Sequence, residues 1–600
     1  MLQFHRILFV ISSAALIAVL ASTSSPVTTS LAQAADQPPR GHVNKNGIDL
    51  DVRSLGRQIA DEVAATGNAV LPDEVSPVPG GPVVPQVKLR RGNVQTNDGS
   101  LDNIQIFPGT RPFVKFTQSE TSVAAHDRNI VAVYNTSANQ PIVQSGPNLA
   151  FTRRLLSGFS VSNDGGTTWT SGFIPPVSGS SFTFGDGVLD VDRHGNFYFA
   201  GLGADASEKD TIQVNKSTDG GRTWSPAVIV QQDDGGDKEW IAVGRDPVLG
   251  SRDNVYVTWT SFQPDHSELR FGRSTDGGST WTTKTIFNPA ATPTPGLSNF
   301  LQFSNPYVDP VTARLYVPFL QFGNADQDFI RILMSDDAGD TFSFATFNIP
   351  GAPDPTLLPV TSAGELLDCG TSGGLRLTIH AGSNIGGGQF GLRRFVRASR
   401  LVTQPAFAAR NGVLYLAWSN STSLIFGDPN SGSNIFFIQS DDGGTSWTVP
   451  IQINPTVATD VHHVLPSLAI DNDPNDVHVA YYTQHTDGTV DVDMANSHDR
   501  GESFPANRTV RITPSSFALA PTNIPLPLPL DPFNTTNFDR TIRPCYSLGE
   551  YMSVKSANGA TYALWGDGRN SVTEPVNPFD PISGQTHPQN DVFFQAVKAQ

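Results

Sequence analysis

The sequence has little cysteine, little methionine and a shortage of positive charge, and each shortage limits what the protein can be. Its 600 residues include 2 cysteines and 4 methionines, against 54 glycines and 45 prolines. Such a composition favours a turn-rich, all-β protein with few helices. The formal net charge of -17 at pH 7 argues against a nucleic-acid partner, because that surface needs an excess of Lys and Arg. The acidity is compatible with bound calcium, or it serves only solubility.

Long apolar runs are missing after the N-terminus. The one apolar stretch, Ile7 to Ala21, follows Arg6 and is short for a membrane span. Ala32-Gln33-Ala34 then provides a small-x-small cleavage site. We predict a signal peptide over residues 1–34, cleaved near Ala34, and therefore a secreted, periplasmic or cell-surface protein with no membrane span after cleavage. An uncleaved membrane anchor is the alternative.

The two cysteines, Cys369 and Cys545, lie in long irregular segments. In an exported protein they can form a disulfide that ties the two segments together. Two free thiols are the alternative, and the sequence leaves both open.

What the sequence does have is the motif Ser-x-Asp-x-Gly-x-Thr/Ser-aromatic, whose six copies span residues 162–169, 217–224, 274–281, 335–342, 440–447 and 497–504. Such repeats indicate a radial or stacked architecture. Glycine allows the positive φ of a tight hairpin turn, and the Ser and Asp side chains can bond nearby backbone N–H groups. The aromatic residue can bury against a neighbouring repeat. Six equivalent carboxylates round a ring cannot all face one active site, so we interpret them as structural: Asp164, Asp219, Asp276, Asp337, Asp442 and Asp499.

A second repeated element is a pair of short apolar strands joined by a polar turn. Its seven copies lie at 121–134, 188–200, 241–259, 307–319, 406–418, 468–481 and 551–565. A strand pair followed by a motif hairpin has room for four strands, which is one blade of a β-propeller. We therefore predict an all-β fold, a β-propeller of four-stranded blades, with seven blades favoured and six as the alternative. The last strand, 591–597, is predicted to close the ring by pairing into an outer blade.

The predicted domain organisation is a flexible leader over residues 35–115, with one short helix near 55–65, followed by the propeller over 116–600. Two insertions interrupt the propeller rhythm, at 350–400 and at 513–545. Long loops of this kind often carry function. The glycine-rich run within the first insertion, 382–391, does not follow a strand and open a helix, so we do not interpret it as a phosphate-binding loop.

Polar residues recur where the chain enters the first strand of each unit, at the mouth of the central channel. They are Glu120, Asp186, Asp237, Lys238, Glu239, Trp240, Asn305, Gln404, His462, His463, Glu550 and Tyr551. We predict a ligand site here, with a merely wet, polar channel mouth as the alternative. No close His/Asp/Glu spacing recurs, so we predict no metal and no cofactor, with calcium as the one ion that the acidity leaves open.

The six-fold motif resembles the Asp-box, or bacterial neuraminidase repeat, of a family that includes sialidases. The resemblance covers residues 116–600. Sialidases have six blades, bind the substrate carboxylate with three arginines and use a Tyr–Glu pair as nucleophile. Their nucleophilic Tyr begins a strand that leads through a polar turn into an apolar strand, and Tyr551 has a similar place, with Tyr546 as a weaker candidate.

The resemblance and the polar positions at the channel mouth together give the candidate site residues. The candidate catalytic residues are Tyr551, Glu550 and Glu239. A phenol is a poor nucleophile unless a carboxylate takes its proton, and Glu239 or Glu120 would do so. Guanidinium groups that could bind a carboxylate are those of Arg543, Arg569 and Arg245. The other candidate ligand-binding residues are Trp240, Asp186, Glu120 and His463.

The sequence also departs from the sialidase pattern. Sialidases carry an aromatic-Arg-Ile-Pro element before the first blade, and the nearest stretch here, 110–113, lacks it. Xyloglucan-active and sortilin-type propellers also carry Asp-boxes, so the motif indicates the fold better than the reaction. We predict an exported propeller that recognises an extracellular glycan or glycoconjugate at the channel mouth. The alternatives are an active exo-sialidase or other glycoside hydrolase, and a protein-interaction scaffold without catalysis.

Overall fold

The computed structural model describes residues 84–85, 93–99, 103–105, 112–114, 118–136, 142–145, 148–151, 154–363, 403–425, 431–455, 461–471, 475–485, 489–518, 549–557, 559–573 and 586–598. The predicted signal peptide, the predicted helix near 55–65, both cysteines and most of both insertions lie outside these residues. The regular structure of the described residues is β-strand, apart from short 3-10 turns such as the one at Ala506–Arg508.

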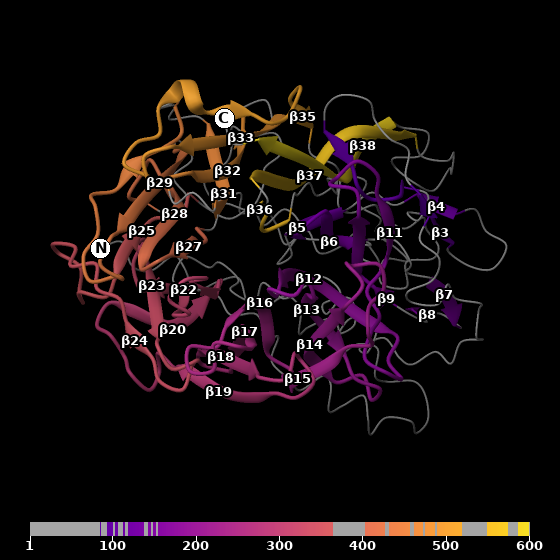
Figure 1. Cartoon of the computed structure of the whole chain (residues 1–600), viewed down its shortest axis with the longest axis horizontal. Helices are drawn as coiled ribbons and strands as arrows, with labels where there is room; N and C mark the ends of the chain where they lie inside the picture. The colour runs from indigo at the N-terminus through magenta and orange to yellow at the C-terminus, as the bar shows by residue number, and fades with distance from the viewer. Residues whose placement is uncertain are drawn as a thin grey trace, which may run out of the picture.

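The strands form a ring of four-stranded antiparallel blades round a central axis (Figure 1). Blades one to three consist of β5 (Gln118–His126), β6 (Asn129–Thr136), β10 (Ser157–Ser162) and β11 (Thr170–Phe173); β12 (Phe182–Val191), β13 (Phe197–Ala204), β14 (Asp210–Ser217) and β15 (Val228–Gln232); and β16 (Gly236–Arg245), β17 (Asp253–Phe262), β18 (Ser267–Ser274) and β19 (Thr282–Phe287). At their edges, β1 (Val84–Pro85) pairs with β11, and β9 (Arg154–Leu155) pairs with β12.

Blades four to six follow the same order. They consist of β20 (Leu297–Gln302), β21 (Tyr307–Val308), β22 (Leu315–Gly323), β23 (Asp328–Ser335), β24 (Ser343–Phe344) and β25 (Leu358–Val360); β27 (Ala406–Arg410), β28 (Val413–Ser421), β29 (Ser433–Ser440) and β30 (Ile451–Gln452); and β31 (His462–Ile470), β32 (Val477–Gln484), β33 (Thr489–Ser497), β34 (Val510–Arg511) and β35 (Phe517–Ala518). A single parallel pairing, Ser433 with His462, joins blades five and six.

The seventh blade closes the ring. It contains β36 (Ser553–Ala557), β37 (Ala560–Thr573), β38 (Thr586–Lys598) and, on its outer edge, β2 (Val94–Gln95). Within the described residues, two further hairpins form separate two-stranded sheets: β3 (Asn103–Gln105) with β4 (Pro112–Val114), and β7 (Ile142–Ser145) with β8 (Asn148–Phe151). The predicted propeller is confirmed, and the described residues form seven blades.

The way in which the ring closes differs from the prediction. The C-terminal strand β38 is the third strand of the last blade, and the N-terminal strand β2 supplies the fourth. Val94 pairs with Phe594, and Gln95 pairs with Phe593. Residues 93–97 therefore belong to the propeller, although the sequence placed them in the leader. A strand of two residues is too short to show the apolar–polar alternation by which a strand is predicted from sequence.

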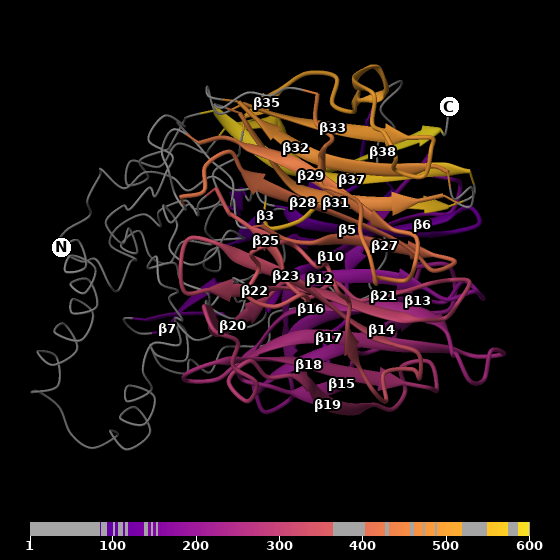
Figure 2. The same ribbon diagram turned by 90° about the vertical axis from the view of Figure 1, so that its left-hand side faces the viewer.

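The core lies between successive blades. The inner strands contact one another in the order β5, β12, β16, β21, β27, β31, β36 and back to β5. Side chains from the facing sheets, such as Tyr256 and Phe271 of blade three and Phe319 of blade four, form one buried cluster. Figure 2 shows the blades from the side. This packing of broad apolar faces is what the runs of Val, Ile, Tyr and Phe predict.

Side chains bridge the inner strands where no sheet pairing does. The backbone N–H of Leu189 donates to the Ser122 hydroxyl at 3.0 Å, and that of Val554 donates to the Ser467 hydroxyl at 3.0 Å. Because the inner strand is the edge of each blade, these two N–H groups would otherwise be buried without an acceptor, which costs free energy of folding. The bridges hold neighbouring blades in register round the channel.

The repeated motif forms the hairpin turn between the third and fourth strands of six blades. In the third copy, the Asp276 carboxylate accepts the Ser274 hydroxyl (2.8 Å), the Thr280 hydroxyl (2.6 Å) and the backbone N–H of Thr280 (2.9 Å). The aromatic residues pack on the preceding blade. Trp169 of blade one contacts Phe594 of blade seven with ring centroids 5.0 Å apart. These contacts agree with the structural interpretation of the six carboxylates.

We expect Asp276→Ala to lower the free energy of unfolding by about 1–2 kcal/mol, because it removes the acceptor that closes one turn. Burial alone would raise the pKa of Asp276, but hydrogen bonds, chiefly from Thr280, lower it to about 2, so the carboxylate is ionised at neutral pH. The measurement is urea denaturation, with ligand binding followed below the melting transition. Loss of binding at an unchanged melting temperature would contradict the structural role.

Candidate functional site

Three inner strands carry a bulge at the same level of the channel, and each bulge presents a charged residue. Glu120, Asp186 and Lys238 have left-handed φ values of 53°, 58° and 50°, and the strand register shifts beside each of them. A left-handed conformation is uncommon for residues other than glycine and is costly. On the inner strands of blades four and six, the left-handed residues near the same level are the apolar Phe303 and Leu465. Among the described residues, blades one to three are therefore the ones that use a left-handed bulge to place a charge.

The three bulges meet at the ammonium of Lys238. Its Nζ lies 3.0 Å from Asp186 Oδ2 and 3.9 Å from Glu120 Oε1, and it also contacts the Glu550 carboxylate. All four side chains are buried. Burial opposes the charge of Lys238, but the carboxylates of Asp186 and Glu120 outweigh it and raise its pKa above the ordinary value. We call these four residues the charged cluster.

Asn135 completes the charged cluster from the neighbouring strand β6. Its amide donates to Glu120 and, at 3.3 Å, to Asp186 Oδ1, while its carbonyl oxygen accepts the backbone N–H of Asp186 at 2.7 Å. The cluster thus joins blades one, two, three and seven. An ammonium ion hydrogen-bonded among carboxylates offsets much of the cost of burying them.

Tyr551 and Trp240 lie directly beside the charged cluster. Their rings meet edge to face with centroids 5.2 Å apart, and Lys238 Nζ lies 5.6 Å from the Tyr551 centroid. The Tyr551 hydroxyl donates to the Gly187 carbonyl at 3.4 Å. Burial, followed by the charges of Glu120 and Asp186, raises the pKa of Tyr551 well above its ordinary value. The phenol is therefore neutral and holds its proton.

Glu239 differs from its neighbours because both of its buried carboxyl oxygens lack a hydrogen-bond partner among the described residues. Burial and the charge of Asp186 raise its pKa well above the ordinary value. Glu239 therefore favours its neutral, protonated form beside the charged cluster. A carboxyl group whose pKa is raised in this way is typical of a general acid.

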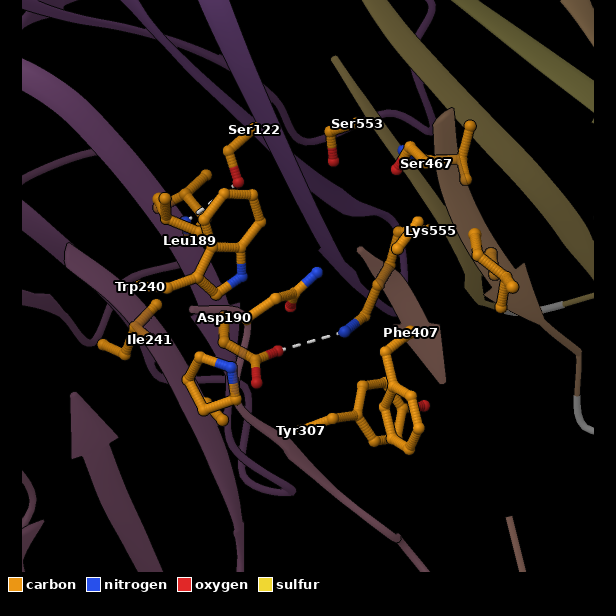
Figure 3. A pocket seen from close by; sticks show the side chains of 18 of the residues that line it. Ser122, Leu189, Asp190, Trp240, Ile241, Tyr307, Phe407, Ser467, Ser553 and Lys555 are labelled. Atoms are coloured by element: carbon orange, nitrogen blue, oxygen red, sulfur yellow. Dashed lines mark hydrogen bonds and ion pairs between the residues drawn. The ribbon is translucent and has the colours of Figure 1, made fainter. Parts of the chain in front are cut away.

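A cavity of about 380 Å³ runs along the channel from the charged cluster. Trp240, Tyr307 and Phe407 supply its aromatic walls (Figure 3). Across it, Lys555 Nζ binds Asp190 Oδ1 at 3.1 Å, and this carboxylate raises the pKa of Lys555. The far end is lined by Arg245, which is exposed. The cavity thus connects the charged cluster with solvent at the end where the inner strands terminate.

The structure brings some of the predicted site residues together and separates others. Tyr551, Glu550, Asp186, Glu120 and Trp240 form one site, with Glu239 adjoining it. Arg245 ends β16, seven residues beyond Lys238 and so roughly 20 Å away along the strand. Arg543 lies outside the described residues.

Arg569 and His463 are engaged within their own blades. Arg569 forms an ion pair with Asp567 and stacks on Phe593 at 4.1 Å. His463 is buried, hydrogen-bonds Thr483 at 3.1 Å, and has its pKa lowered to about 4 by burial. Within the described part of the chain, the cation beside Tyr551 is Lys238, where the resemblance implied arginines. The ligand-binding roles assigned from sequence remain predictions.

Sequence reasoning did not single out Asp190, Lys555 and Tyr307, which line the same cavity. Asp190 and Lys555 are 365 positions apart, and nothing local signals that they meet. Among the described residues, no group of three or more His, Cys, Asp or Glu could hold a metal ion. The prediction of no cofactor, with calcium as the alternative, stays a prediction.

No protein-family model matches the chain, and no curated protein matches it significantly. Solved structures with some likeness include a protein of unknown function from Dyadobacter fermentans (12% identity, 71% of this chain and 97% of that chain, TM-score 0.39). Another is the Hadza microbial sialidase Hz136 (13% identity, 86% of this chain and 95% of that chain, TM-score 0.35). A third is an α-L-arabinanase from Penicillium chrysogenum (11% identity, 59% of this chain and 92% of that chain, TM-score 0.32). The fold assignment rests on this chain's own strand pairing. In the described part of the chain, no helix has the length and apolar character of a membrane span.

Proposed function

We propose that this protein recognises an extracellular glycan in the channel, at the end formed by Trp240, Tyr551 and the charged cluster. The observation that carries the proposal is the half-buried Trp240 ring, which lines the cavity beside Tyr551 and Lys238. Sugars present apolar C–H faces that suit aromatic rings, and their hydroxyls suit charged hydrogen-bonding groups. The cavity volume of about 380 Å³ falls within the ordinary range for small ligands. The extracellular setting rests on the predicted export signal.

Hydrolysis is the second candidate, and the neutral Glu239 favours it. A carboxylic acid whose raised pKa keeps it protonated could act as a general acid. The Tyr551 phenol argues against a Tyr nucleophile, because among the described residues it donates to the Gly187 backbone carbonyl and not to a carboxylate. Its raised pKa also opposes the loss of its proton. Recognition without turnover is therefore our first choice.

We expect Trp240→Ala to weaken glycan binding at least tenfold, about 1.4 kcal/mol, because the stacking surface is lost. Trp240→Phe should retain most of the affinity, and Tyr551→Phe should change it little. Isothermal titration calorimetry with glycans selected on an array gives the measurement. Trp447→Ala is the control, since this half-buried ring packs on Phe347 in another blade. Unchanged affinity in Trp240→Ala would place the site elsewhere.

Tyr551→Phe and a further variant, Glu239→Gln, separate binding from catalysis. If the protein hydrolyses a fluorogenic sialoside with Glu239 as the general acid, Glu239→Gln should abolish turnover while leaving the fold intact; Tyr551→Phe should do so only if the phenol is the nucleophile. If the protein only binds glycans, the wild type should show no turnover, and both variants should bind as it does.

A further inference from the structure

Two neighbouring blades repeat a short turn that the glycan site does not use. Blade three has Asp246-Pro247-Val248 after β16, and blade four has Asp309-Pro310-Val311 after β21. In each turn the aspartate carboxylate accepts the backbone N–H of the valine at 2.8 Å, and the proline fixes φ at the position between them. The two turns are therefore stiff, and they hold the two valines in equivalent places.

Both turns expose apolar side chains to solvent. Val248 is 76% exposed, Leu249 is 52% exposed and Val311 is 48% exposed. A single exposed aliphatic side chain is ordinary, but these three stand on adjacent blades and on turns that have already lost most of their backbone freedom. Contact with a partner would cost them little further conformational entropy. The repetition therefore indicates a binding surface.

Contacts between blades join these turns into one surface at the open end of the cavity. The Arg193 guanidinium of blade two donates to the Gly250 carbonyl of blade three at 3.2 Å. A Cβ on Gly244 would lie 2.5 Å from Val308, so the end of blade three packs closely on blade four. The Asp309 carboxylate accepts the backbone N–H of Gly412 in blade five at 2.8 Å. We call residues 192–196, 245–253, 309–314 and 410–413 the rim.

The rim has its negative charges buried and its positive charges at the surface. The buried carboxylates are those of Asp192, Asp246, Asp253 and Asp309. The rim arginines are all at least partly exposed: Arg193, Arg245, Arg252, Arg314 and Arg410. The side chains of Arg193 and Arg252, for example, are 39% and 40% exposed. A chain with a net charge of -17 thus presents positive charge beside its exposed apolar turns.

Farther from the channel, exposed aspartates of the motif turns are bound by arginines. Asp336 pairs with Arg314 at 2.8 Å, Asp340 pairs with Arg273 at 2.8 Å, and Asp441 pairs with Arg500 at 2.7 Å. These pairs neutralise part of the acidic charge around the rim.

We propose that the rim docks on an anionic phospholipid surface, with Val248, Leu249 and Val311 inserted at the boundary between headgroups and acyl chains. Aliphatic side chains gain free energy by leaving water, and arginines bind phosphate oxygens in a bidentate manner. Together they hold peripheral proteins on anionic bilayers. The charge of the rim is therefore complementary to this partner. Protein interfaces, by contrast, centre on aromatic residues, whereas the exposed apolar side chains of the rim are aliphatic.

The docking surface is independent of the proposed glycan function. The rim residues that line the cavity include Arg193, Pro310 and Arg410, whereas the three apolar side chains are exposed to solvent. Either proposal can therefore fail while the other stands.

Vesicle cosedimentation of the full chain tests the surface. The wild type should bind vesicles of equal parts phosphatidylcholine and phosphatidylglycerol at least tenfold more tightly than vesicles of phosphatidylcholine alone, and added salt should reduce this preference. Val248→Ser/Leu249→Ser/Val311→Ser should bind the anionic vesicles at least tenfold more weakly than the wild type. The matched control is Leu424→Ser/Ile425→Ser/Val449→Ser, which changes apolar side chains of blade five that are at least as exposed, and it should bind as the wild type does.

Three results would overturn the docking surface. They are no binding by the wild type, equal wild-type binding to the two kinds of vesicle, and equal binding by all three proteins. A wild type that ignores vesicles but self-associates in analytical ultracentrifugation, with the association lost in Val248→Ser/Leu249→Ser/Val311→Ser, would assign the rim to a second copy of the chain.

A local probe separates the rim from other lipid-binding parts of the chain, such as the apolar stretch at residues 7–21. Val248→Trp should move its fluorescence emission, measured as a difference from the wild type, to shorter wavelength when anionic vesicles are added, because the indole leaves water. Val449→Trp is equally well exposed at the native valine and should show no such shift. An equal response of the two variants would mean that lipid contacts another part of the chain, and the proposal would be wrong.

Discussion

Lys238→Met should cost more stability than any other single change to the site, with an expected loss of about 3–5 kcal/mol at pH 7. Methionine is close to lysine in length, so the packing survives while the charge is lost. The carboxylates of Glu120, Asp186 and Glu550 would then share a buried space without their ammonium. Removal of one partner from a buried ion pair is costly because the charges that remain are uncompensated.

The loss should depend on pH in a defined direction. Without Lys238, protonation relieves the repulsion among the three buried carboxylates in the folded state, and it brings no such gain in the unfolded chain. The folded state then binds more protons than the unfolded state, and stability falls as pH rises through this range. The stability deficit of Lys238→Met should therefore be smaller at pH 5 than at pH 7.5.

Urea denaturation of both proteins at the two pH values gives the measurement. Lys209→Met removes an exposed ammonium and should cost little at either pH. Lys238→Met/Glu550→Gln removes one of the uncompensated charges and should recover part of the stability, which keeps the test informative if the single variant does not fold. A loss below about 1 kcal/mol that is equal at both pH values would contradict the role of Lys238.

The predicted ring of blades depended on features that are local in the sequence. Each motif turn is held by contacts within eight residues, such as Ser274 and Thr280 with Asp276, so the motif implies its own structure. The paired strands are adjacent hairpins, and their apolar alternation predicts them directly. Ring closure is different, because β2 and β38 lie at opposite ends of the chain and neither implies the other.

The site was only partly predictable for a related reason. Its residues enter the channel at equivalent places in the repeats, so the repeat itself indicated Glu120, Asp186 and Glu550. Which of them bind one another depends on the bulges and the curvature of the ring. No sequence pattern reveals that the Lys238 ammonium lies between these carboxylates, or that Asp190 meets Lys555 across the cavity.

A buried carboxyl group, that of Asp591, lies where the N-terminal strand closes the ring. Asp591 Oδ1 accepts the Asn97 amide at 2.7 Å, and the Asn97 side-chain carbonyl accepts the backbone N–H of Val592 at 2.8 Å. Burial raises the pKa of Asp591 from 3.8 to about 6, although the amides of Asn570 and Asn97 partly oppose the rise. Between these two pKa values the folded state binds more protons than the unfolded state. This group therefore makes the fold less stable as pH rises from about 4 to about 6.

Asn97→Ala should lower the free energy of unfolding by about 2–4 kcal/mol at pH 7, because a buried carboxylate loses a donor and a backbone N–H loses its acceptor. At pH 5 the loss should be smaller, since Asp591 is then mostly protonated and needs fewer donors. The matched control is Asn93→Ala on the same segment. Its amide donates to the Ile512 carbonyl and to Gln595, neither of which titrates, so its cost should be equal at both pH values.

Thermal and urea unfolding at pH 5 and pH 7 compare the two variants with the wild type. A greater loss for Asn97→Ala at pH 7 than at pH 5, with no such difference for Asn93→Ala, would support a role for the ionised Asp591 in ring closure. The same pH dependence in both variants would show instead that the N-terminal strand stabilises the ring only through its backbone pairing. Both variants weaken the same N-terminal strand, but only Asn97→Ala removes a hydrogen bond to Asp591. The difference between them therefore isolates the effect of this one carboxyl group.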